Sequence, residues 1–282
     1  MSEIDAYIIA WTGREAAARA IAAALEPAVR SVTVVYSNQD GEPWDGPGEW
    51  VEVPDEWFYG PKFAATLRLH GQRDPGAVML QVQADATCED WPGLAARCAA
   101  VFATRDAVAV WAPDVSFTPL PLRLTGLADA GPDLHHVALV DGIVWALSPD
   151  TVERLARHDY RANNVGWGID WAAACFARST GKEVLVDASL HVSHPPSRGY
   201  RTDDAEAQME RFLDQLDDAE QAARALLRGY LAPRRSSRPV RDGVRDALRH
   251  QVHLARARWQ DARTGSREAE RRVVPGTVPG PG

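Results

Sequence analysis

The chain has 282 residues, 45% of them hydrophobic, and a net charge of −8, which supplies enough apolar material for one large domain or a domain with an appendage. Its three cysteines, Cys88, Cys98 and Cys175, form no CxxC pair, which argues against a disulfide framework and a thiolate metal site. No apolar stretch reaches the roughly 18 residues of a membrane span, and the N-terminus lacks the basic start and small-residue cleavage site of a secretory signal, so we expect a globular protein of the cytoplasm.

The first 111 residues alternate between stretches typical of strands and stretches typical of helices. Residues 31–37 are β-branched, as in a strand, and residues 14–29 are rich in alanine with apolar residues at helical spacing. In chain order, the pattern predicts a strand at 6–11, a helix at 14–29, a strand at 31–37, a loop at 38–50, a helix at 58–71, a strand at 77–82, a helix at 92–104 and a strand at 107–111. This order predicts an α/β fold of Rossmann-like type, with a mostly parallel sheet flanked by helices.

The alternation continues less regularly up to residue 195. Residues 112–133 are punctuated by prolines and predict a long crossing segment. The remaining elements are two short strands within 135–148 joined near Asp141-Gly142, a helix at 149–158, a loop and helix over 163–178, and a strand at 183–195 that stops at His194-Pro195-Pro196. We therefore assign residues 1–200 to one α/β body.

After residue 200 the sequence changes to two amphipathic helical stretches separated by a break at 232–239. The residues on the apolar faces are Phe212, Leu216, Ala219, Ala223, Leu226 and Tyr230 in the first stretch and Val240, Val244, Leu248, Val252 and Trp259 in the second. This pattern predicts a C-terminal helical hairpin over 201–264, packed on the body or on a second subunit as in a homodimer. Residues 265–282 are rich in Pro and Gly and are predicted to be disordered.

Charge is distributed unevenly along the chain. Residues 1–223 hold 17 Lys and Arg against 34 Asp and Glu, a net of −17, whereas residues 224–282 hold 14 against 5, a net of +9. A basic end of this kind is compatible with an anionic partner, such as a membrane surface touched peripherally, or with helices that lie across the protein's own acidic body. We favour the second interpretation. We expect no specific nucleic-acid partner, because Trp259 is the only aromatic residue after Tyr230.

An acidic side chain follows a strand that is predicted to be buried. In QVQADA, Gln83 and Asp85 stand just after the strand at 77–82. Ligands of an open parallel sheet bind in the crevice outside the carboxyl ends of its strands, where a carboxylate can hold a divalent cation that bridges two phosphates. The alternative is that Asp85 caps the following turn or helix.

Two later stretches carry side chains of matching chemistry. HVSHP places His191 and His194 after another predicted strand, where a neutral imidazole could complete a metal site; His191 is the better candidate for a merely polar strand-end residue. In GWGIDW, residues 166–171, the glycines permit close backbone approach, Trp167 offers a flat apolar platform, and Asp170 can accept a proton from a hydroxyl. The alternatives are an N-cap role for Asp170 and a core position for Trp167.

The order of strand-end QAD, GWGID and a strand ending in histidine resembles that of the GT-A glycosyltransferases, nucleotide-sugar-dependent enzymes with a Rossmann-like sheet and a DxD motif. The resemblance covers about residues 5–200, and GWGIDW is similar to the GWG-[ED] motif of galactosyltransferases. It implies Mn²⁺ or Mg²⁺ as a divalent cation, a nucleoside diphosphate sugar such as a UDP-sugar as donor, and a hydroxyl acceptor.

Carried over residue by residue, the resemblance assigns Asp85 and His194 to the metal site and Asp170 to the catalytic base. It assigns the acceptor site to Asp141, Trp145 and Trp167. It assigns the donor site to Trp11, Thr12, Gly13, Ser37, Asn38, Lys62, Gln83, Arg198 and Tyr200.

The sequence departs from the family pattern at two points. Gln83 stands where the first Asp of DxD is expected, and GWG is followed by the single carboxylate of Asp170. One hypothesis is an inverting, metal-assisted glycosyltransferase of hexosyltransferase type. The other is a protein that has kept the nucleotide pocket and lost turnover, and that acts as a binding or scaffold protein. A nucleotidyltransferase shares the α/β opening, but residues 10–20 lack a Gly-rich basic loop.

Overall fold

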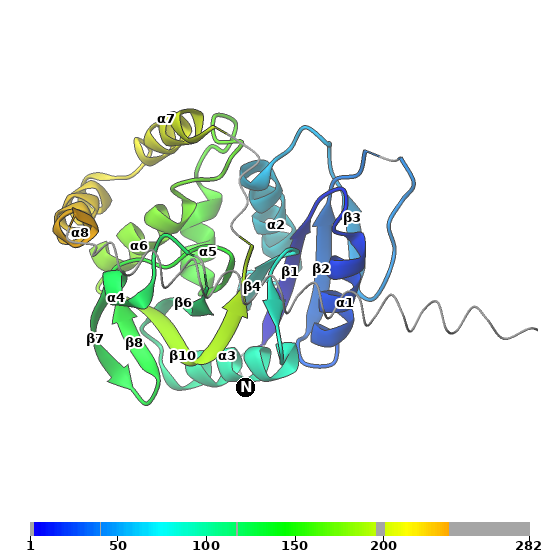
Figure 1. Cartoon of the computed structure of the whole chain (residues 1–282), viewed down its shortest axis with the longest axis horizontal. Helices are drawn as coiled ribbons and strands as arrows, with labels where there is room; N and C mark the ends of the chain where they lie inside the picture. Colours follow the sequence, from blue (N-terminus) through cyan, green and yellow to red (C-terminus); the bar gives the residue numbers. More distant parts are fainter. Residues whose placement is uncertain (1–2, 40, 117, 196–200, 237–282) are drawn as a thin grey trace, which may run out of the picture. The chain divides into compact units, whose positions relative to one another are not determined.

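A computed structural model describes residues 3–39, 41–116, 118–195 and 201–236 (Figure 1). Within these residues, ten strands form one sheet in the order β3-β2-β1-β4-β9-β6-β10-β8-β7, and β5 pairs with β10 beside this path. The strands are β1 (Ile4–Ala10), β2 (Ser31–Tyr36), β3 (Glu49–Glu52), β4 (Val78–Gln83), β5 (Thr87–Cys88), β6 (Val108–Val115), β7 (Gly126–Gly131), β8 (Leu134–Val137), β9 (Val144–Leu147) and β10 (Glu183–Ser193). The helices are α1 (Glu15–Leu25), α2 (Tyr59–Arg73), α3 (Trp91–Thr104), α4 (Leu122–Thr125), α5 (Pro149–Ala156), α6 (Ile169–Ser179), α7 (Thr202–Leu213) and α8 (Asp218–Ser236).

The α/β class expected from the sequence is confirmed, but the sheet is more mixed than predicted. The strands β3, β2, β1 and β4 are parallel, as are β6 and β10. By contrast, β9 lies antiparallel between β4 and β6, and β8 is antiparallel to both β10 and β7.

The two outermost strands of the sheet were not predicted. Residues 38–50 were expected to be a loop and 112–133 a crossing segment, whereas β3 begins at Glu49 and β7 occupies Gly126–Gly131. Both strands lie at the ends of the sheet, and most of their residues are partly or fully exposed. An edge strand of this kind lacks the buried apolar run by which a sequence marks a strand.

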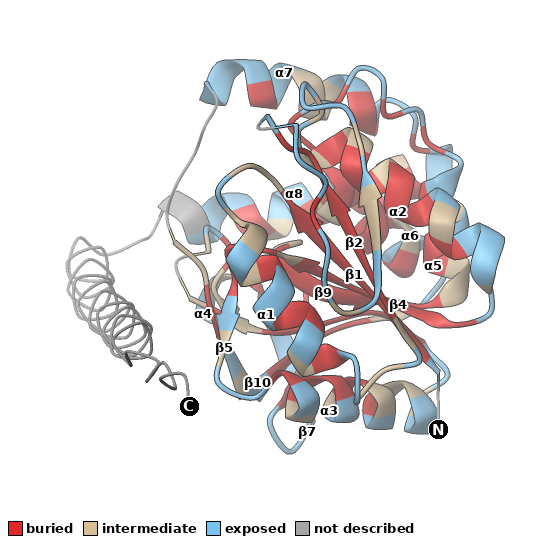
Figure 2. Ribbon diagram, turned by 90° about the vertical axis from the view of Figure 1, so that its right-hand side faces the viewer, coloured by how far each residue is buried: buried red, intermediate tan, exposed pale blue. Residues whose placement is uncertain are grey.

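Helices cover both faces of the sheet (Figure 1). Side chains alternate along β1, so that Ile4 and Ile8 join the core under α1 and α3, while Tyr7 and Ile9 join the core under α2, α5 and α6. Burial is concentrated in the strands and on the inward faces of these helices (Figure 2). This three-layer arrangement leaves the ends of the strands as the places where polar side chains can gather.

The helices α7 and α8 belong to the same core as α5 and α6. The buried apolar residues that they contribute are Phe212, Leu213, Leu216, Ala223, Leu227 and Leu231. Leu226, which was predicted to lie on the apolar face, is 63% exposed. The predicted face assumed one continuous helix, whereas the break between Leu213 and Asp218 changes the helical register.

Two basic residues in the middle of α8 lie against acidic partners of the same chain. Arg224 and Arg228 each pair with Glu210 of α7 at 2.5 Å, and Glu220 of α8 pairs with Arg154 of α5 at 2.5 Å. For these residues of α8, the partners are acidic side chains of the same chain, and the interpretation of the basic end as a whole stays a prediction. None of the helices in the described part of the chain combines the length and the apolar character that crossing a bilayer requires.

The chain divides into the units Met1–Arg235 and Ser236–Gly282. Residues 237–264 of the predicted hairpin and the tail at 265–282 lie outside the described residues. The boundaries expected at residues 200 and 264 therefore stay predictions.

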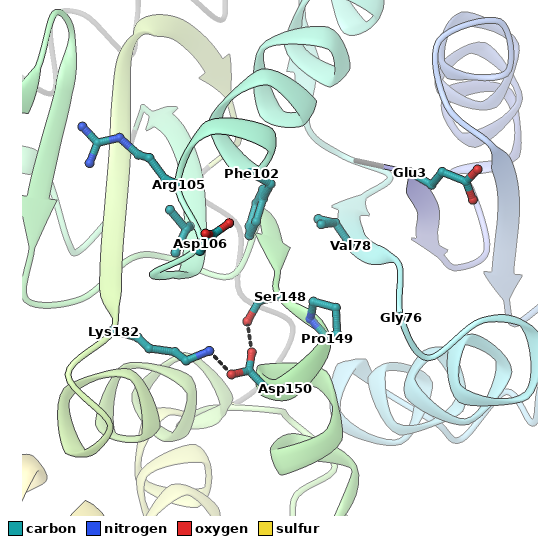
Figure 3. Close-up of a pocket in the computed structure, with 11 residues that line it drawn as sticks. Glu3, Gly76, Val78, Phe102, Arg105, Asp106, Ser148, Pro149, Asp150 and Lys182 are labelled. Carbon is teal, nitrogen blue, oxygen red and sulfur yellow. Dashed lines mark hydrogen bonds and ion pairs between the residues drawn. The ribbon is translucent and has the colours of Figure 1, made fainter. Parts of the chain in front are cut away.

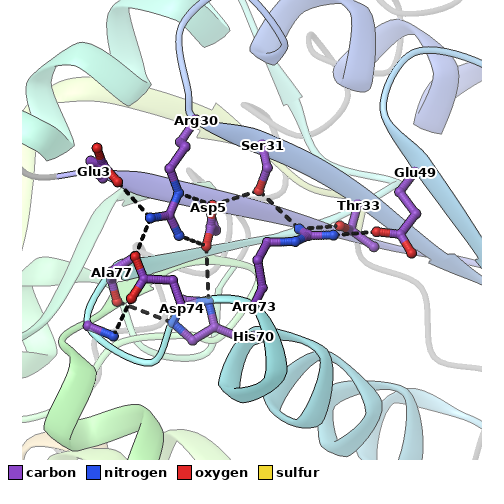
Figure 4. A network of polar contacts seen from close by, with 11 residues as sticks. Glu3, Asp5, Arg30, Ser31, Thr33, Glu49, His70, Arg73, Asp74 and Ala77 are labelled. Carbon is purple, nitrogen blue, oxygen red and sulfur yellow. Dashed lines mark hydrogen bonds and ion pairs between the residues drawn. The ribbon is translucent and has the colours of Figure 1, made fainter.

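A polar network occupies the amino ends of β1 and β2 (Figure 4). Asp5 is fully buried and accepts hydrogen bonds from Arg30 Nε at 2.9 Å and from Ser31 Oγ at 2.6 Å. The network also contains Glu3, Thr33, Glu49, Arg73 and Asp74. A buried carboxylate is tolerated here because charged and hydroxyl donors surround it.

Candidate active site

The loops that leave the carboxyl ends of β1 and β2 hold most of the predicted donor-site residues. Thr12 Oγ1 accepts a hydrogen bond from the backbone N–H of Gln39 at 3.0 Å, which joins the two loops. Asn38 is buried and donates from Nδ2 to the backbone oxygen of Glu42 at 2.5 Å. Gly13 has a positive φ of 84° and open space where a side chain would stand, so its backbone is accessible to a ligand.

Lys62 of α2 joins the ends of β1 and β2 from within the protein. Its Nζ donates to the backbone oxygen of Ala10 at 2.9 Å and to Ser37 Oγ at 2.8 Å. Burial lowers the pKa of the Lys62 ammonium to about 8. Since an ammonium has three donors, these two bonds hold Lys62 against the strand ends and leave one donor. Arg198 and Tyr200, also predicted for the donor site, lie outside the described residues.

Asp85 lies in the turn between β4 and β5, opposite the end of β10. The two residues of β5 pair antiparallel with Val192 and Ser193 of β10, which brings the end of that strand to the turn. The Oδ2 atom of Asp85 lies 3.3 Å from Nε2 of His194, whereas its Oδ1 atom is buried without a hydrogen-bond partner. Two residues that are 109 positions apart in the sequence thus meet at one point.

The alternatives weighed for Asp85 and His191 can be compared with the observed contacts. The side-chain cap of α3 is Asp90, which accepts from the backbone N–H of Gly93 at 2.8 Å. His191 lies 3.7 Å from Asp114, and 55% of its side chain is exposed. Asp90 thus supplies the cap of α3, and His194 is the histidine that faces Asp85.

The chemistry of the Asp85–His194 pair fits a divalent cation. A carboxylate oxygen and an imidazole nitrogen are both ligands of Mn²⁺, and the unpartnered Oδ1 of Asp85 is an acceptor that still lacks a donor or a cation. Within the described residues there is no cluster of three or more His, Cys, Asp or Glu side chains suited to a metal. A cation held here would therefore take further ligands from phosphate oxygens or water.

A polar cluster at the carboxyl end of β4 supports the loop that carries Asp141 and Gly142. Gln83 donates from Nε2 to the backbone oxygen of Gly142 at 3.3 Å. Gln81, two residues earlier on the same face of β4, accepts at Oε1 from the hydroxyl of Tyr59 at 2.8 Å and from Nε1 of Trp145 at 2.5 Å. Asp141, next to Gly142, accepts from Thr118 Oγ1 at 2.6 Å.

Trp145 cannot serve as the acceptor platform that the resemblance implied. Its side chain is fully buried in β9 and packs on Phe63 at a ring distance of 5.7 Å. The alternating pattern of a buried strand turns its ring into the core rather than into the crevice. Trp167 is half-buried, and it keeps the predicted platform role as a hypothesis.

The glycines of GWGIDW allow two close approaches of backbone to side chains. Gly166 and Gly168 have φ values of 87° and 90°, which favour glycine. A Cβ on Gly166 would lie 2.4 Å from Cδ1 of Tyr59, and one on Gly168 would lie 2.8 Å from Cγ of Met209 in α7. The loop is therefore held between α2 and the C-terminal helix α7.

Asn163 fixes the backbone of the same loop with both ends of its amide. Its Oδ1 accepts from the backbone N–H of Gly166 at 3.0 Å, and its Nδ2 donates to the backbone oxygen of Trp167 at 3.0 Å. It is fully buried. Asparagine before a glycine is typical of a turn. The sequence did not indicate which of the two neighbours, Asn163 or Asn164, would bond the backbone of this loop.

Asp170 lies in the first turn of α6 rather than at its N-cap, which is Gly168. Burial raises the pKa of the Asp170 carboxyl to about 7, and the negative charge of Asp141 raises it further. The helix N-terminus opposes this effect, but a macrodipole stabilises a carboxylate by only about 0.3–1 kcal/mol, which is less than one pKa unit. Burial outweighs it, so the carboxyl exchanges its proton near neutral pH.

A hollow of about 400 Å³ lies at the opposite end of the strands, near the amino ends of β4, β6 and β10 (Figure 3). Lys182 on its wall pairs with Asp150, and Ser148 donates to the same carboxylate. Arg105 donates to Glu183. These charges are paired with one another, and the hollow is remote from Asp85 and Asp170, so we do not assign the active site to it.

Comparison with known proteins supports the fold only. No family model matches the sequence, and the comparison with curated proteins finds no relative. Among solved structures, the chain is similar to GalNAc-T7 with UDP, GalNAc and Mn²⁺, with a TM-score of 0.50 and 11% identity over 78% of this chain and 49% of that one. The chain thus spans about half the length of GalNAc-T7.

Two further structures align with nearly their whole length. They are UDP-glucose pyrophosphorylase complexed with UDP-glucose, with a TM-score of 0.46 and 12% identity over 79% of this chain and 98% of that one, and UTP-bound UGPase from Acinetobacter baumannii, with a TM-score of 0.46 and 9% identity over 80% of this chain and 99% of that one. The comparison with GalNAc-T7 and the layered sheet together define the class of the body, which is a GT-A-like α/β fold.

Proposed function

We propose that the protein is a nucleotide-sugar-dependent glycosyltransferase that inverts the configuration of the transferred sugar with the help of a divalent cation. The observation that carries this proposal is the contact of Asp85 with His194 at the carboxyl edge of the sheet, where a buried carboxylate oxygen has no hydrogen-bond partner. This edge is where open α/β sheets bind nucleotides. The residues around it match the resemblance in order and in chemistry.

Asp85 and His194 would hold the cation, and a cation bound there would neutralise charge that develops on the leaving diphosphate. The loops after β1 and β2 would bind the base and ribose, with Thr12 and Asn38 fixing their shape. Lys62 would hold the floor of this pocket and add positive charge below pH 8, because its pKa is about 8. Gln83, which cannot supply charge, would contact a ribose hydroxyl.

Asp170 would accept the proton of the acceptor hydroxyl. The hydroxyl oxygen forms a bond to the anomeric carbon from the face opposite the diphosphate, the bond from that carbon to the phosphate oxygen breaks, and the diphosphate leaves with the electron pair. A base with a pKa of about 7 is half-ionised at neutral pH, which suits this transfer. Asp141 and Trp167 would bind the acceptor.

The first test is calorimetric titration of UDP and GDP into the protein with and without Mn²⁺. We expect one nucleotide to bind only with the metal, and Asp85→Ala to abolish this binding. His191→Ala is a matched control because His191 is exposed near the same strand end, and it should bind like the wild type. If neither nucleotide binds under any condition, the proposed donor site is wrong.

The second test is turnover with a panel of UDP- and GDP-sugars. We expect Asp170→Asn to lower kcat by about 100- to 10,000-fold, the usual contribution of a general base, with nucleotide affinity unchanged. Nucleotide binding without transfer or donor hydrolysis for any sugar would favour the binding-protein hypothesis instead. Release of pyrophosphate from a nucleoside triphosphate and a sugar phosphate would assign a nucleotidyltransferase. The cytoplasmic location, a homodimer and a peripheral membrane contact through the basic end stay predictions.

A further inference from the structure

Tyr59, the first residue of α2, lies between the two loops that carry the acids of the candidate site. Its hydroxyl donates to Gln81 Oε1 at 2.8 Å and lies 3.1 Å from the backbone oxygen of Gly142, the residue after Asp141. Its ring lies against Gly166, where a Cβ would come within 2.4 Å of Cδ1. One side chain thus contacts the loop of Asp141 through its hydroxyl and the loop of Asp170 through its ring.

The backbone at Tyr59 is itself fixed. The backbone N–H of Gly60 donates to the backbone oxygen of Asn164 at 3.0 Å, and that of Phe58 donates to Asn164 Oδ1 at 2.9 Å. A Cβ on Gly60 would lie only 1.8 Å from the backbone oxygen of Asn163, so the start of α2 and the loop before GWGIDW are in direct backbone contact. Tyr59 therefore has little freedom to follow either loop.

The electrostatics of the phenol agree with this placement. Burial raises the pKa of Tyr59 well above its ordinary value, and the charges of Asp170 and Asp141 both raise it further. The hydroxyl therefore stays protonated and remains a donor throughout the pH range in which Asp170 titrates. Both carboxylates lie close enough to act on the same side chain.

We propose that Tyr59 is a positioning residue that sets the separation between Asp141 and Asp170 and thereby the direction in which Asp170 faces the acceptor hydroxyl. Its effect on the rate rests on the proposed function, whereas its effect on the two loops does not. The hydroxyl holds the carbonyl of Gly142, and the ring limits how far the backbone at Gly166 can approach. Since Coulomb repulsion between carboxylates depends on their separation, a change at Tyr59 changes the proton affinity of Asp170.

The test uses Tyr59→Phe, which removes the hydroxyl and keeps the ring. Tyr160→Phe is the matched control, because Tyr160 is also buried and packs on Phe63, but its hydroxyl donates to the backbone oxygen of Leu155 at 3.0 Å, away from both loops. The first measurement is the titration of the Asp170 carboxyl by ¹³C NMR, with Asp170→Asn to assign the signal. We expect a shift in the midpoint of at least about 0.3 pH unit in Tyr59→Phe and no shift in Tyr160→Phe.

The second measurement is the pH profile of kcat and the donor KM. We expect Tyr59→Phe to lower kcat by about 5- to 10-fold, the scale of one lost hydrogen bond, with the donor KM within about twofold of the wild-type value. Gly166→Ala, which drives a Cβ into the Tyr59 ring, should shift the same titration, so the inference does not depend on one variant folding. Unchanged titration in both variants would overturn it. A shifted titration in a protein that transfers no sugar would support the placement of Tyr59 and contradict the proposed function.

Discussion

Acidic side chains at the amino ends of β1 and its neighbours are surrounded by hydrogen-bond donors, whereas those at the carboxyl ends are not. At the amino ends, the buried carboxylate of Asp5 is surrounded by the donors of Arg30 and Ser31. At the carboxyl ends, Asp85 Oδ1 has no hydrogen-bond partner, and the half-buried Asp170 has a pKa that desolvation raises to about 7. The first region uses polar groups to complete the fold. The second holds a carboxylate oxygen without a hydrogen-bond partner and a carboxyl group with a raised pKa, two features that are frequent at functional sites.

The largest expected difference between the regions is in stability. Asp5→Ala would remove the fully buried partner of Arg30, which would keep the more exposed carboxylates of Glu3 and Asp74, and removal of one partner of a buried pair costs up to about 3–5 kcal/mol. Asp85→Ala removes a carboxylate whose Oδ1 is unpartnered, so its free energy of unfolding should stay within about 1 kcal/mol of the wild-type value. Urea unfolding of both variants measures this, and a similar loss in both would erase the distinction.

A smaller effect with a defined pH dependence is expected at Asp170. Its folded pKa of about 7 lies above the ordinary value near 4, so the unfolded chain loses this proton at lower pH than the folded chain does. The contribution of Asp170 to stability therefore falls as the pH rises from about 4 to 7. Asp170→Asn escapes this loss and should be more stable than the wild type by about 1–3 kcal/mol at pH 8, after allowance for partial exposure of the side chain.

Urea unfolding at pH 4.5 and pH 8 checks the sign of this effect, because the difference between the two proteins should be small at the lower pH and larger at the higher. A variant less stable than the wild type at pH 8 would show that Asp170 serves the fold, as Asp5 does. It would also remove the contrast between the two ends of the strands.

The smallest effect is expected from Asp141. Its negative charge is the second cause, after burial, of the raised pKa of Asp170. Asp141→Asn should therefore lower the pKa of Asp170 by less than about one unit and move the acidic limb of the activity profile to lower pH. Asp129→Asn, at a side chain that is 90% exposed in the β7 edge, is the control and should leave the limb in place. A limb that moves to higher pH would contradict the assignment of Asp141 as a neighbouring charge.

The parts of the fold that the sequence predicted are those whose burial leaves a local pattern. The strands β1, β2 and β4 and the helices α1 and α3 carry continuous apolar runs or faces, and each was predicted within a few residues. The edge strands β3 and β7 are held by backbone pairing and have little burial. The order of the sheet, with β9 between β4 and β6, depends on contacts between distant segments and has no local signal.

The candidate site divides in the same way. The sequence singled out Asp85, His194 and Asp170 because they stand at strand ends or in a glycine-flanked loop, and the structure places Asp85 beside His194, while their roles stay predictions. Trp145 was misassigned, because sequence alone does not say which face of a buried strand meets the core. Tyr59 was missed, since its role comes from contacts with Gly142 and Gly166, far from it in the chain.

The close approach of α7 to Gly168 has a consequence for protein engineering. The glycine leaves room for Met209, and Gln208 Oε1 accepts from the backbone N–H of Val165 at 3.0 Å. The helix α7 thus packs directly against the loop that carries Asp170, although α7 follows the α/β body in sequence. Exchanging the C-terminal helices would therefore also disturb the loop that carries Asp170, unless residues 163–170 were transplanted with them as one module.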